Sequence, residues 1–274
     1  MIRSIIAVVM LMIGCAGTVP RIDHPLGVWI PDGKKPNGLL IHQSYLADYS
    51  SNHRQARWIF YKLVDDRTES QVKRGERFQP DPLVTEGPAT LKDYRGGDSR
   101  GRHFDRGHLK PAADSRSSAA EMEESFYLSN ISPQDPGFNR GIWRRLEEEI
   151  RRFVENDQEL YIITGPCLHD NLPVIGANRV SIPERFYKAV YDLKPPQKKA
   201  IAFLIPNRNS SRPLTDFVIS IDSLEKTVGI DFFPQLDDQL ENQLEKTSRI
   251  EDWEFSVLPP NKETSPVNRK VLKH

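Results

Sequence analysis

The chain consists of short hydrophobic runs separated by polar segments, and the periods of these runs predict both strands and helices. Runs rich in β-branched and aromatic residues predict strands at 38–49, 57–64, 160–164, 185–193, 199–205 and 217–221. Apolar residues at helical spacing predict helices at 118–127, 139–154, 222–227 and 236–247. Residues 65–100 show little periodicity and predict a long loop, which in a compact domain is usually functional. Because strands and helices do not alternate strictly, the pattern predicts one α+β domain.

The two ends of the chain depart from this pattern. Residues 1–14 combine a positive start with an apolar run at 5–13. That run is shorter than the about 20 residues of a membrane-spanning helix and fits an export signal. It ends in Gly14-Cys15, which resembles a bacterial lipoprotein signal with Cys15 acylated, and an ordinary cleaved signal is the alternative. We therefore expect a signal segment at 1–14, a tether at 15–37, one domain at 38–257 and a disordered tail at 258–274. The protein is expected to be periplasmic or at the cell surface as a membrane-anchored lipoprotein, or else secreted.

Composition and charge exclude several classes of protein. The 274 residues include 38 Lys+Arg and 38 Asp+Glu, so the net charge of zero argues against binding nucleic acid by bulk charge. Two cysteines cannot form a disulfide scaffold or a cysteine-based zinc cluster. The charge is nevertheless segregated, with +3 at 95–110, +2 at 139–152 and −5 at 234–254. The two basic segments also hold the candidate catalytic residues. This arrangement would suit a phosphodiester substrate, because such a substrate needs cations where its negative charge lies.

The segment 103–114 concentrates reactive side chains in the tetrapeptide Asp105-Arg106-Gly107-His108. An imidazole such as that of His108 serves as a general base near neutral pH. The guanidinium of Arg106 can hold a phosphate through two hydrogen bonds. Gly107 lets the backbone turn sharply or approach a ligand. A structural role remains the alternative for any single histidine, so this tetrapeptide alone is only suggestive.

A second pattern lies on the predicted helix at 139–154. Four apolar residues at helical spacing form a stripe for the core: Ile142, Leu146, Ile150 and Phe153. A neighbouring row spaced by four residues contains Asn139, Trp143, Glu147 and Arg151. Polar groups aligned beside a buried stripe indicate the wall of a site. A surface ion pair between Glu147 and Arg151 is the structural alternative.

Together these motifs resemble the sugar-non-specific DNA/RNA endonucleases that carry an Asp-Arg-Gly-His motif, including secreted bacterial nucleases and mitochondrial endonuclease G. His108 and Asn139 are 31 residues apart, and the resemblance extends from about Leu39 to about Phe233. It implies a central antiparallel β-sheet flanked by helices, with an active site of two strands and a helix, the ββα-metal motif. Further matching segments are Trp58 with Tyr61, Asp81-Pro82, Asp93-Tyr94, Ser129-Asn130-Ile131-Ser132-Pro133-Gln134, Tyr161-Ile162-Ile163-Thr164-Gly165-Pro166, Ile182-Pro183 and Tyr187-Lys188.

The resemblance also implies a role for each matching residue. His108 matches the general base that activates a water. Asn139 matches the sole direct protein ligand of a catalytic Mg²⁺, for which Mn²⁺ can substitute, and one amide oxygen suffices because Mg²⁺ keeps several waters. Glu147 matches a carboxylate that holds those waters, and Arg151 matches a cation near the scissile phosphate.

Four further positions are implied less directly. Asp105, Arg106 and Asn130 match residues that shape the site. The family also places an arginine shortly before an aromatic-x-x-Asp-Pro segment, where this chain has Glu76 flanked by Arg74 and Arg77. We assign that role to Arg77.

The sequence therefore predicts a Mg²⁺-dependent endonuclease that hydrolyses DNA and RNA without sequence specificity and leaves 5′-phosphate ends. A metal phosphodiesterase for small nucleotides or lipid head groups is one alternative. A catalytically silent nucleic-acid-binding module is the other. A homodimer is compatible with the sequence.

Overall fold

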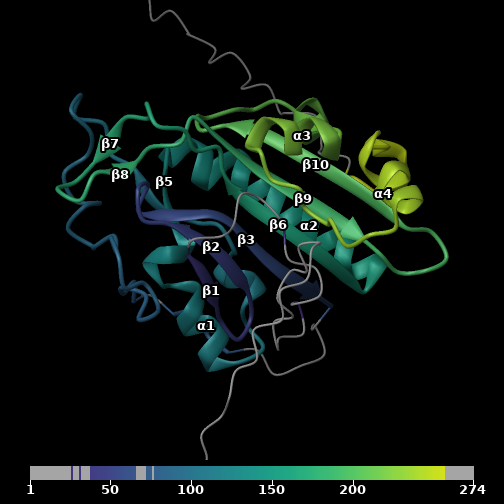
Figure 1. Ribbon diagram of the computed structural model, residues 1–274, viewed down its shortest axis with the longest axis horizontal. Helices are drawn as coiled ribbons and strands as arrows, with labels where there is room; N and C mark the ends of the chain where they lie inside the picture. Colours follow the sequence, from purple (N-terminus) through teal and green to yellow (C-terminus); the bar gives the residue numbers. More distant parts are fainter. Residues whose placement is uncertain (1–25, 27–30, 32–37, 66–71, 76, 257–274) are drawn as a thin grey trace, which may run out of the picture.

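A seven-stranded antiparallel β-sheet organises the computed structural model, which describes residues 26, 31, 38–65, 72–75 and 77–256. The strand order is β1-β2-β3-β6-β9-β10-β11 (Figure 1). The strands are β1 (Leu39–Ile41), β2 (Leu46–Ser50), β3 (Gln55–Val64), β6 (Glu159–Pro166), β9 (Arg185–Asp192), β10 (Lys199–Pro206) and β11 (Val218–Ile219). The central strands β3, β6, β9 and β10 are almost continuously apolar because both faces of the sheet are covered.

Helices cover the two faces of this sheet and create two hydrophobic cores. On one face lies α2 (Arg144–Asp157), whose predicted stripe is buried as expected, from Ile142 in the preceding turn to Phe153. On the other face lie α3 (Ile221–Val228) and α4 (Asp238–Glu245), which pack Ile221, Leu224 and Leu244 against the sheet. Figure 1 shows α3 and α4 on the opposite side of the strands from α2. The predicted α+β fold with an antiparallel sheet flanked by helices is confirmed.

Smaller elements connect this frame to the region that carries the motifs. The strands β4 (Asp105–His108) and β5 (Ile131–Gln134) pair with each other antiparallel, outside the main sheet. The strands β7 (Val174–Ile175) and β8 (Val180–Ser181) form a second short ladder. Helix α1 (Ala119–Ser125) and the 3₁₀ turns η1 (Ala112–Asp114) and η2 (Leu128–Asn130) lie between β4 and β5 along the chain. Two more 3₁₀ turns are η4 (Leu214–Phe217) and η5 (Ile250–Asp252).

Several predicted elements differ in detail from the structure. The strand predicted at 217–221 is only the two-residue β11, with Phe217 in η4 and Ile221 at the start of α3. The strand predicted at 38–49 is divided into β1 and β2, which pair with each other around the intervening turn. The helix predicted at 139–154 does not begin as an α-helix. It begins as a π-helical turn, η3 (Phe138–Trp143), and then continues as α2. Within η3, Gly141 has non-helical φ and ψ angles. The periodicity of the apolar stripe does not reveal this wider turn, because α2 carries most of that stripe.

The predicted signal segment, Cys15 and the tail at 258–274 all lie outside the described residues, as does nearly all of the predicted tether. Within the described part of the chain, none of the helices has the length and apolar character needed to cross a bilayer.

Candidate active site

The β4–β5 pair places the tetrapeptide next to the start of α2. Gly107 lies opposite Ser132 in the ladder, and a Cβ on Gly107 would come within 2.1 Å of the Gln134 side chain. Gln134 and the Trp143 indole both donate hydrogen bonds to the backbone carbonyl of His108, at 3.5 and 3.4 Å. Glycine is therefore required for the close packing that fixes the strand carrying the imidazole.

The turn before α2 positions the predicted metal ligand. The carboxylate of Asp135 accepts hydrogen bonds from the backbone N–H groups of Gly137 and Phe138, at 2.8 and 3.1 Å. Its backbone carbonyl accepts one from Asn139 at 2.8 Å. Asn139 then lies in the π-helical turn η3, a conformation that is frequent at functional sites.

Asn139 is joined to the tetrapeptide through Asp105. The Asn139 amide nitrogen donates to Asp105 at 2.9 Å, and the exposed Arg140 donates to both oxygens of the same carboxylate at 2.8 and 2.6 Å. Since Nδ2 of Asn139 makes this hydrogen bond, Oδ1 is the atom left to coordinate a metal ion. Mg²⁺ prefers oxygen ligands, so the amide oxygen of Asn139 fits the implied metal.

His108 lies at the end of β4 in an aromatic environment. Its ring centroid is 5.0 Å from that of Phe126 and 5.4 Å from that of Phe78, and its Nε2 is buried without a hydrogen-bond partner among the described residues. Burial, followed by the charge of Arg74, lowers the pKa of His108 to about 3. The imidazole is therefore neutral at physiological pH, and its unpartnered Nε2 is the atom available to a ligand or a water.

Glu147 lies one turn along α2, above a buried lysine. Burial raises the pKa of Glu147 above its ordinary value, and the ammonium of Lys188 opposes this rise. Lys188 is 1% exposed and donates to the Leu109 carbonyl at 2.9 Å and to Thr164 at 3.1 Å. Its ammonium also lies 4.6 Å from the ring centroid of Trp143. A cation fixed in this way under the helix favours the ionised form of Glu147.

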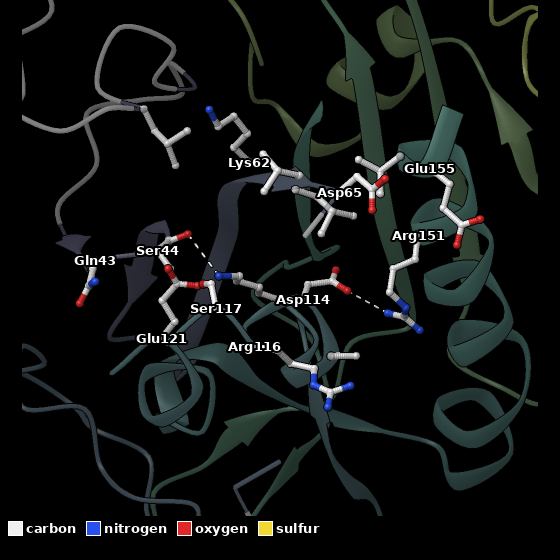
Figure 2. A pocket seen from close by; sticks show the side chains of 16 residues that line it. Gln43, Ser44, Lys62, Asp65, Asp114, Arg116, Ser117, Glu121, Arg151 and Glu155 are labelled. Atoms are coloured by element: carbon white, nitrogen blue, oxygen red, sulfur yellow. Dashed lines mark hydrogen bonds and ion pairs between the residues drawn. The ribbon is translucent and has the colours of Figure 1, made fainter. Parts of the chain in front are cut away.

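Arg151 completes the row, but not as the surface partner of Glu147. It donates to Asp114 at 2.8 Å, and its side chain is 29% exposed. This pair lines a cavity of about 370 Å³, and Figure 2 shows the two side chains pointing toward each other. Trp143, in the same row, is fully buried beside Phe138 and Phe186.

The arginines differ in how closely they approach the site. Arg106 is exposed, and its guanidinium lies 4.5 Å from the ring centroid of Phe78, the neighbour of His108. Arg74 lies close enough to lower the pKa of both His108 and Glu147, and its guanidinium is 5.7 Å from the Phe126 ring centroid. Arg77 is exposed. The assignment of Arg77 stays a prediction. Arg74 is the flanking arginine to which the sequence analysis gave no role.

Asn130 supports the site from behind. It is fully buried, accepts a hydrogen bond from the Lys110 backbone N–H at 2.8 Å, and donates to the carbonyls of Lys110 and Ser125 at 2.9 and 2.7 Å. Its backbone carbonyl accepts from Leu109 at 2.9 Å. Asn130 thus fixes the chain directly after His108 rather than lining the site.

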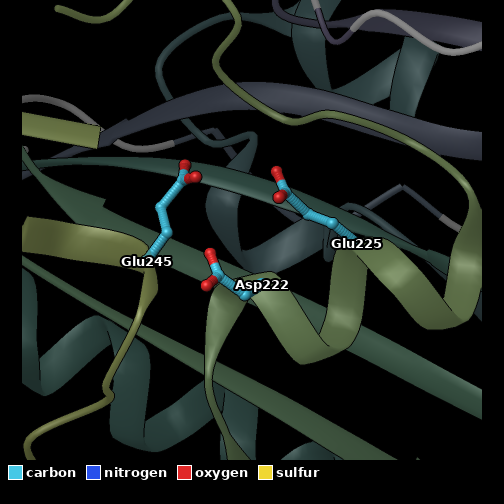
Figure 3. Close-up of side chains that lie close together, drawn as sticks. All are labelled: Asp222, Glu225 and Glu245. Atoms are coloured by element: carbon cyan, nitrogen blue, oxygen red, sulfur yellow. The ribbon is translucent and has the colours of Figure 1, made fainter. Parts of the chain in front are cut away.

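A separate acidic cluster lies on the opposite face of the sheet. Asp222, Glu225 and Glu245 each bring a carboxylate oxygen within 4.8 Å of the others (Figure 3). Burial and the neighbouring carboxylates raise the pKa of Glu225 to about 7 and that of Glu245 to about 8. Asp222 and Glu225 belong to α3 and Glu245 belongs to α4.

The β4–β5–α2 unit and its neighbours bring together a neutral imidazole, an amide oxygen, a carboxylate and several guanidiniums. These groups suit the cleavage of a phosphodiester by a nuclease. Comparison with known proteins gives the same class. The model of the family described as DNA/RNA non-specific endonuclease matches residues 32–239, and the chain belongs to this family.

Its relatives are named nucleases. The mitochondrial nuclease EXOG of Danio rerio is 32% identical over 72% of this chain, and nuclease C1 of Cunninghamella echinulata var. echinulata is 34% identical over 72%. The match covers 61% of the first protein's length and 83% of the second's. Human mitochondrial endonuclease G is 32% identical over 71% of this chain and 69% of its own length.

A solved structure supports the fold. One chain of the EndoG/EndoGI complex superposes with a TM-score of 0.66 at 28% identity, covering 75% of this chain and 88% of that chain. The expectation of an endonuclease with this architecture is therefore confirmed at the level of the family.

Proposed function

We propose that the protein is a Mg²⁺-dependent endonuclease that hydrolyses DNA and RNA without sequence specificity and leaves 5′-phosphate and 3′-hydroxyl ends. The observation that carries the proposal is the hydrogen bond of 2.9 Å from the Asn139 amide to Asp105, which joins η3 to the strand β4 that ends in His108. The names of the relatives and the family match support the same substrate class.

The chain's own residues account for the steps at the phosphate. His108 takes a proton from the attacking water, which then acts as a hydroxide-like nucleophile on phosphorus. Arg106, Arg74 and Arg151 offset the charge that develops on the pentacovalent phosphorane. Glu147 accepts hydrogen bonds from waters at the site, a role that its ionised form serves best. Asp105 and Asn130 hold the surrounding backbone and the Asn139 amide in place.

Asn139 would hold the metal through Oδ1, with Glu147 holding the waters around it. When bound, Mg²⁺ or Mn²⁺ supplies a Lewis acid that stabilises the transition-state charge and the leaving 3′-oxygen. A single direct protein ligand implies modest affinity and a readily exchanged ion.

The test is a side-by-side digest of single-stranded and double-stranded DNA and RNA, with Mg²⁺, with Mn²⁺ and in excess EDTA. Cleavage of all four polymers that EDTA abolishes, with ends that a ligase joins directly, is the expected result. Preference for a chromogenic diester over polymeric DNA would instead indicate a small-molecule phosphodiesterase. Binding of DNA without cleavage would indicate a silent module.

Localisation and assembly form a second part of the proposal, and the support comes from the sequence. The apolar run that ends in Gly14-Cys15 supports export and acylation at Cys15. Export also spares the host chromosome from a non-specific nuclease. Mass spectrometry of the mature N-terminus distinguishes an acylated Cys15 from an unlipidated, secreted form. The molar mass in solution tests whether the protein forms a homodimer, with which the sequence is compatible.

A further inference from the structure

We propose that Asp114, itself fixed by Tyr61, is a positioning residue that holds Arg151 in place to contact the substrate phosphate. This inference rests on the proposed function, because only a phosphodiester substrate gives Arg151 a phosphate to bind. It adds a residue from the turn η1, which directly follows β4, to the residues of β4, η3 and α2.

The contacts of Asp114 are specific. One carboxylate oxygen accepts from Nη1 of Arg151 at 2.8 Å, and the other accepts from the Tyr61 hydroxyl at 2.9 Å. The side chain of Asp114 is only 2% exposed, and Tyr61 is 1% exposed in the core. A buried carboxylate with both oxygens engaged is rigid, so it can define the position of the longer arginine side chain.

The cavity beside this pair shows why packing alone does not hold Arg151. Asp114 and Arg151 both line the cavity of about 370 Å³ (Figure 2), which is also bordered by Lys110, Val154 and Glu155. A guanidinium that lines such a space can adopt several rotamers. The hydrogen bond to Asp114 selects one of them, which reduces the entropy lost when the substrate binds.

The hydrogen-bonding pattern also leaves the guanidinium able to act. Among the described residues, Arg151 donates to protein only through Nη1. Nε and Nη2 remain for an oxyanion, and a guanidinium can donate two parallel hydrogen bonds to a phosphate. Asp114 therefore orients Arg151 without occupying the Nε–Nη2 edge of its guanidinium.

The test is a double-mutant cycle on plasmid cleavage. Asp114→Ala in the wild-type background should lower kcat about tenfold to a hundredfold, the range for residues that orient a group at a metal centre, with little change in KM. In the Arg151→Ala background the same substitution should have almost no further effect, because Asp114 acts through Arg151. Tyr61→Phe, which leaves the carboxylate in place, should give a smaller loss of kcat.

A matched control separates positioning from folding. Arg57 on β3 and Asp48 on β2 form a comparable ion pair at 2.6 Å, with side chains 34% and 7% exposed. Asp48→Ala should lower the melting temperature as Asp114→Ala does, yet leave kcat per folded molecule unchanged. Asp114→Asn, which keeps an acceptor oxygen, should recover part of the activity.

The outcomes are distinguishable. Equal losses of kcat from Asp114→Ala with and without Arg151 would overturn the inference, and so would a loss matched by Asp48→Ala. An inactive wild-type protein would instead refute the proposed function, and this inference with it.

Discussion

Glu245 is predicted to destabilise the folded protein at alkaline pH. It is 2% exposed, lies beside Glu225, and accepts a hydrogen bond from the Tyr191 hydroxyl at 2.9 Å. Its pKa is about 8 in the folded protein against a reference value of 4.5. Between these two values the folded state binds more protons than the unfolded state, so the free energy of unfolding falls as pH rises from 4.5 to 8.

The size of this effect follows from the two pKa values. The difference between about 8 and 4.5 corresponds to an upper limit of about 5 kcal/mol at 1.36 kcal/mol per pH unit. Water penetration and proton sharing with Glu225 reduce it, and we take about 2 kcal/mol at pH 8. Glu245→Gln removes the ionisation and keeps an oxygen for Tyr191. It should therefore raise stability by about 2 kcal/mol at pH 8, or about 4–8 °C in Tm. At pH 5 the gain should be under about 1 kcal/mol.

The assay is urea unfolding of wild type and variant at pH 5, 6, 7 and 8, followed by fluorescence. Glu184→Gln, at an exposed carboxylate, is the matched control and should change stability little at any pH. A gain that is the same at pH 5 and pH 8 would refute the electrostatic reasoning. A loss at pH 8 would mean that the carboxylates hold a cation there.

Four further predictions concern residues of the active site. His108→Ala should lower cleavage by about 10²–10⁴-fold without unfolding the protein, and plasmid nicking within a few-fold of wild type would remove His108 as the base. Asn139→Ala should abolish cleavage while retaining DNA binding in EDTA, measured by gel shift, because the phosphate contacts of the arginines need no metal. Asn139→Asp should bind Mg²⁺ more tightly yet cleave more slowly, since it places an anion beside the phosphate. Gly107→Ala should cost about 1–3 kcal/mol through its overlap with Gln134, whereas Gly96→Ala, with no heavy atom within 4 Å of its Cβ position, should be tolerated.

The long strands and the helix stripe were predictable because burial leaves a period in the sequence. The predicted strands at 57–64, 160–164, 185–193 and 199–205 correspond to β3, β6, β9 and β10 within two residues at each end. The strands β4 and β5 carry no such signal, since each has four residues and they contain Gly107 and Pro133. Only the resemblance to a family indicated two strands at the site.

Side-chain positions in the loop could not be predicted in the same way. Arg74 and Arg77 are three residues apart, and the described residues 72–75, 77 and 78 belong to no helix or strand that would fix the directions of their side chains. The position of Arg74 depends on packing against Phe126 of a distant segment, a tertiary contact that no local pattern encodes. Likewise, Asp114 has no local signal, because its two partners lie 53 and 37 residues away.

The sheet with a separate core on each face divides the molecule into a working side and a side available for attachment. The candidate active site belongs to the face covered by α2, whereas α3 and α4 have a core of their own on the other face. Dyes, affinity tags or immobilising linkers placed on exposed residues of α3 and α4 would thus be separated from the substrate by the full thickness of the sheet.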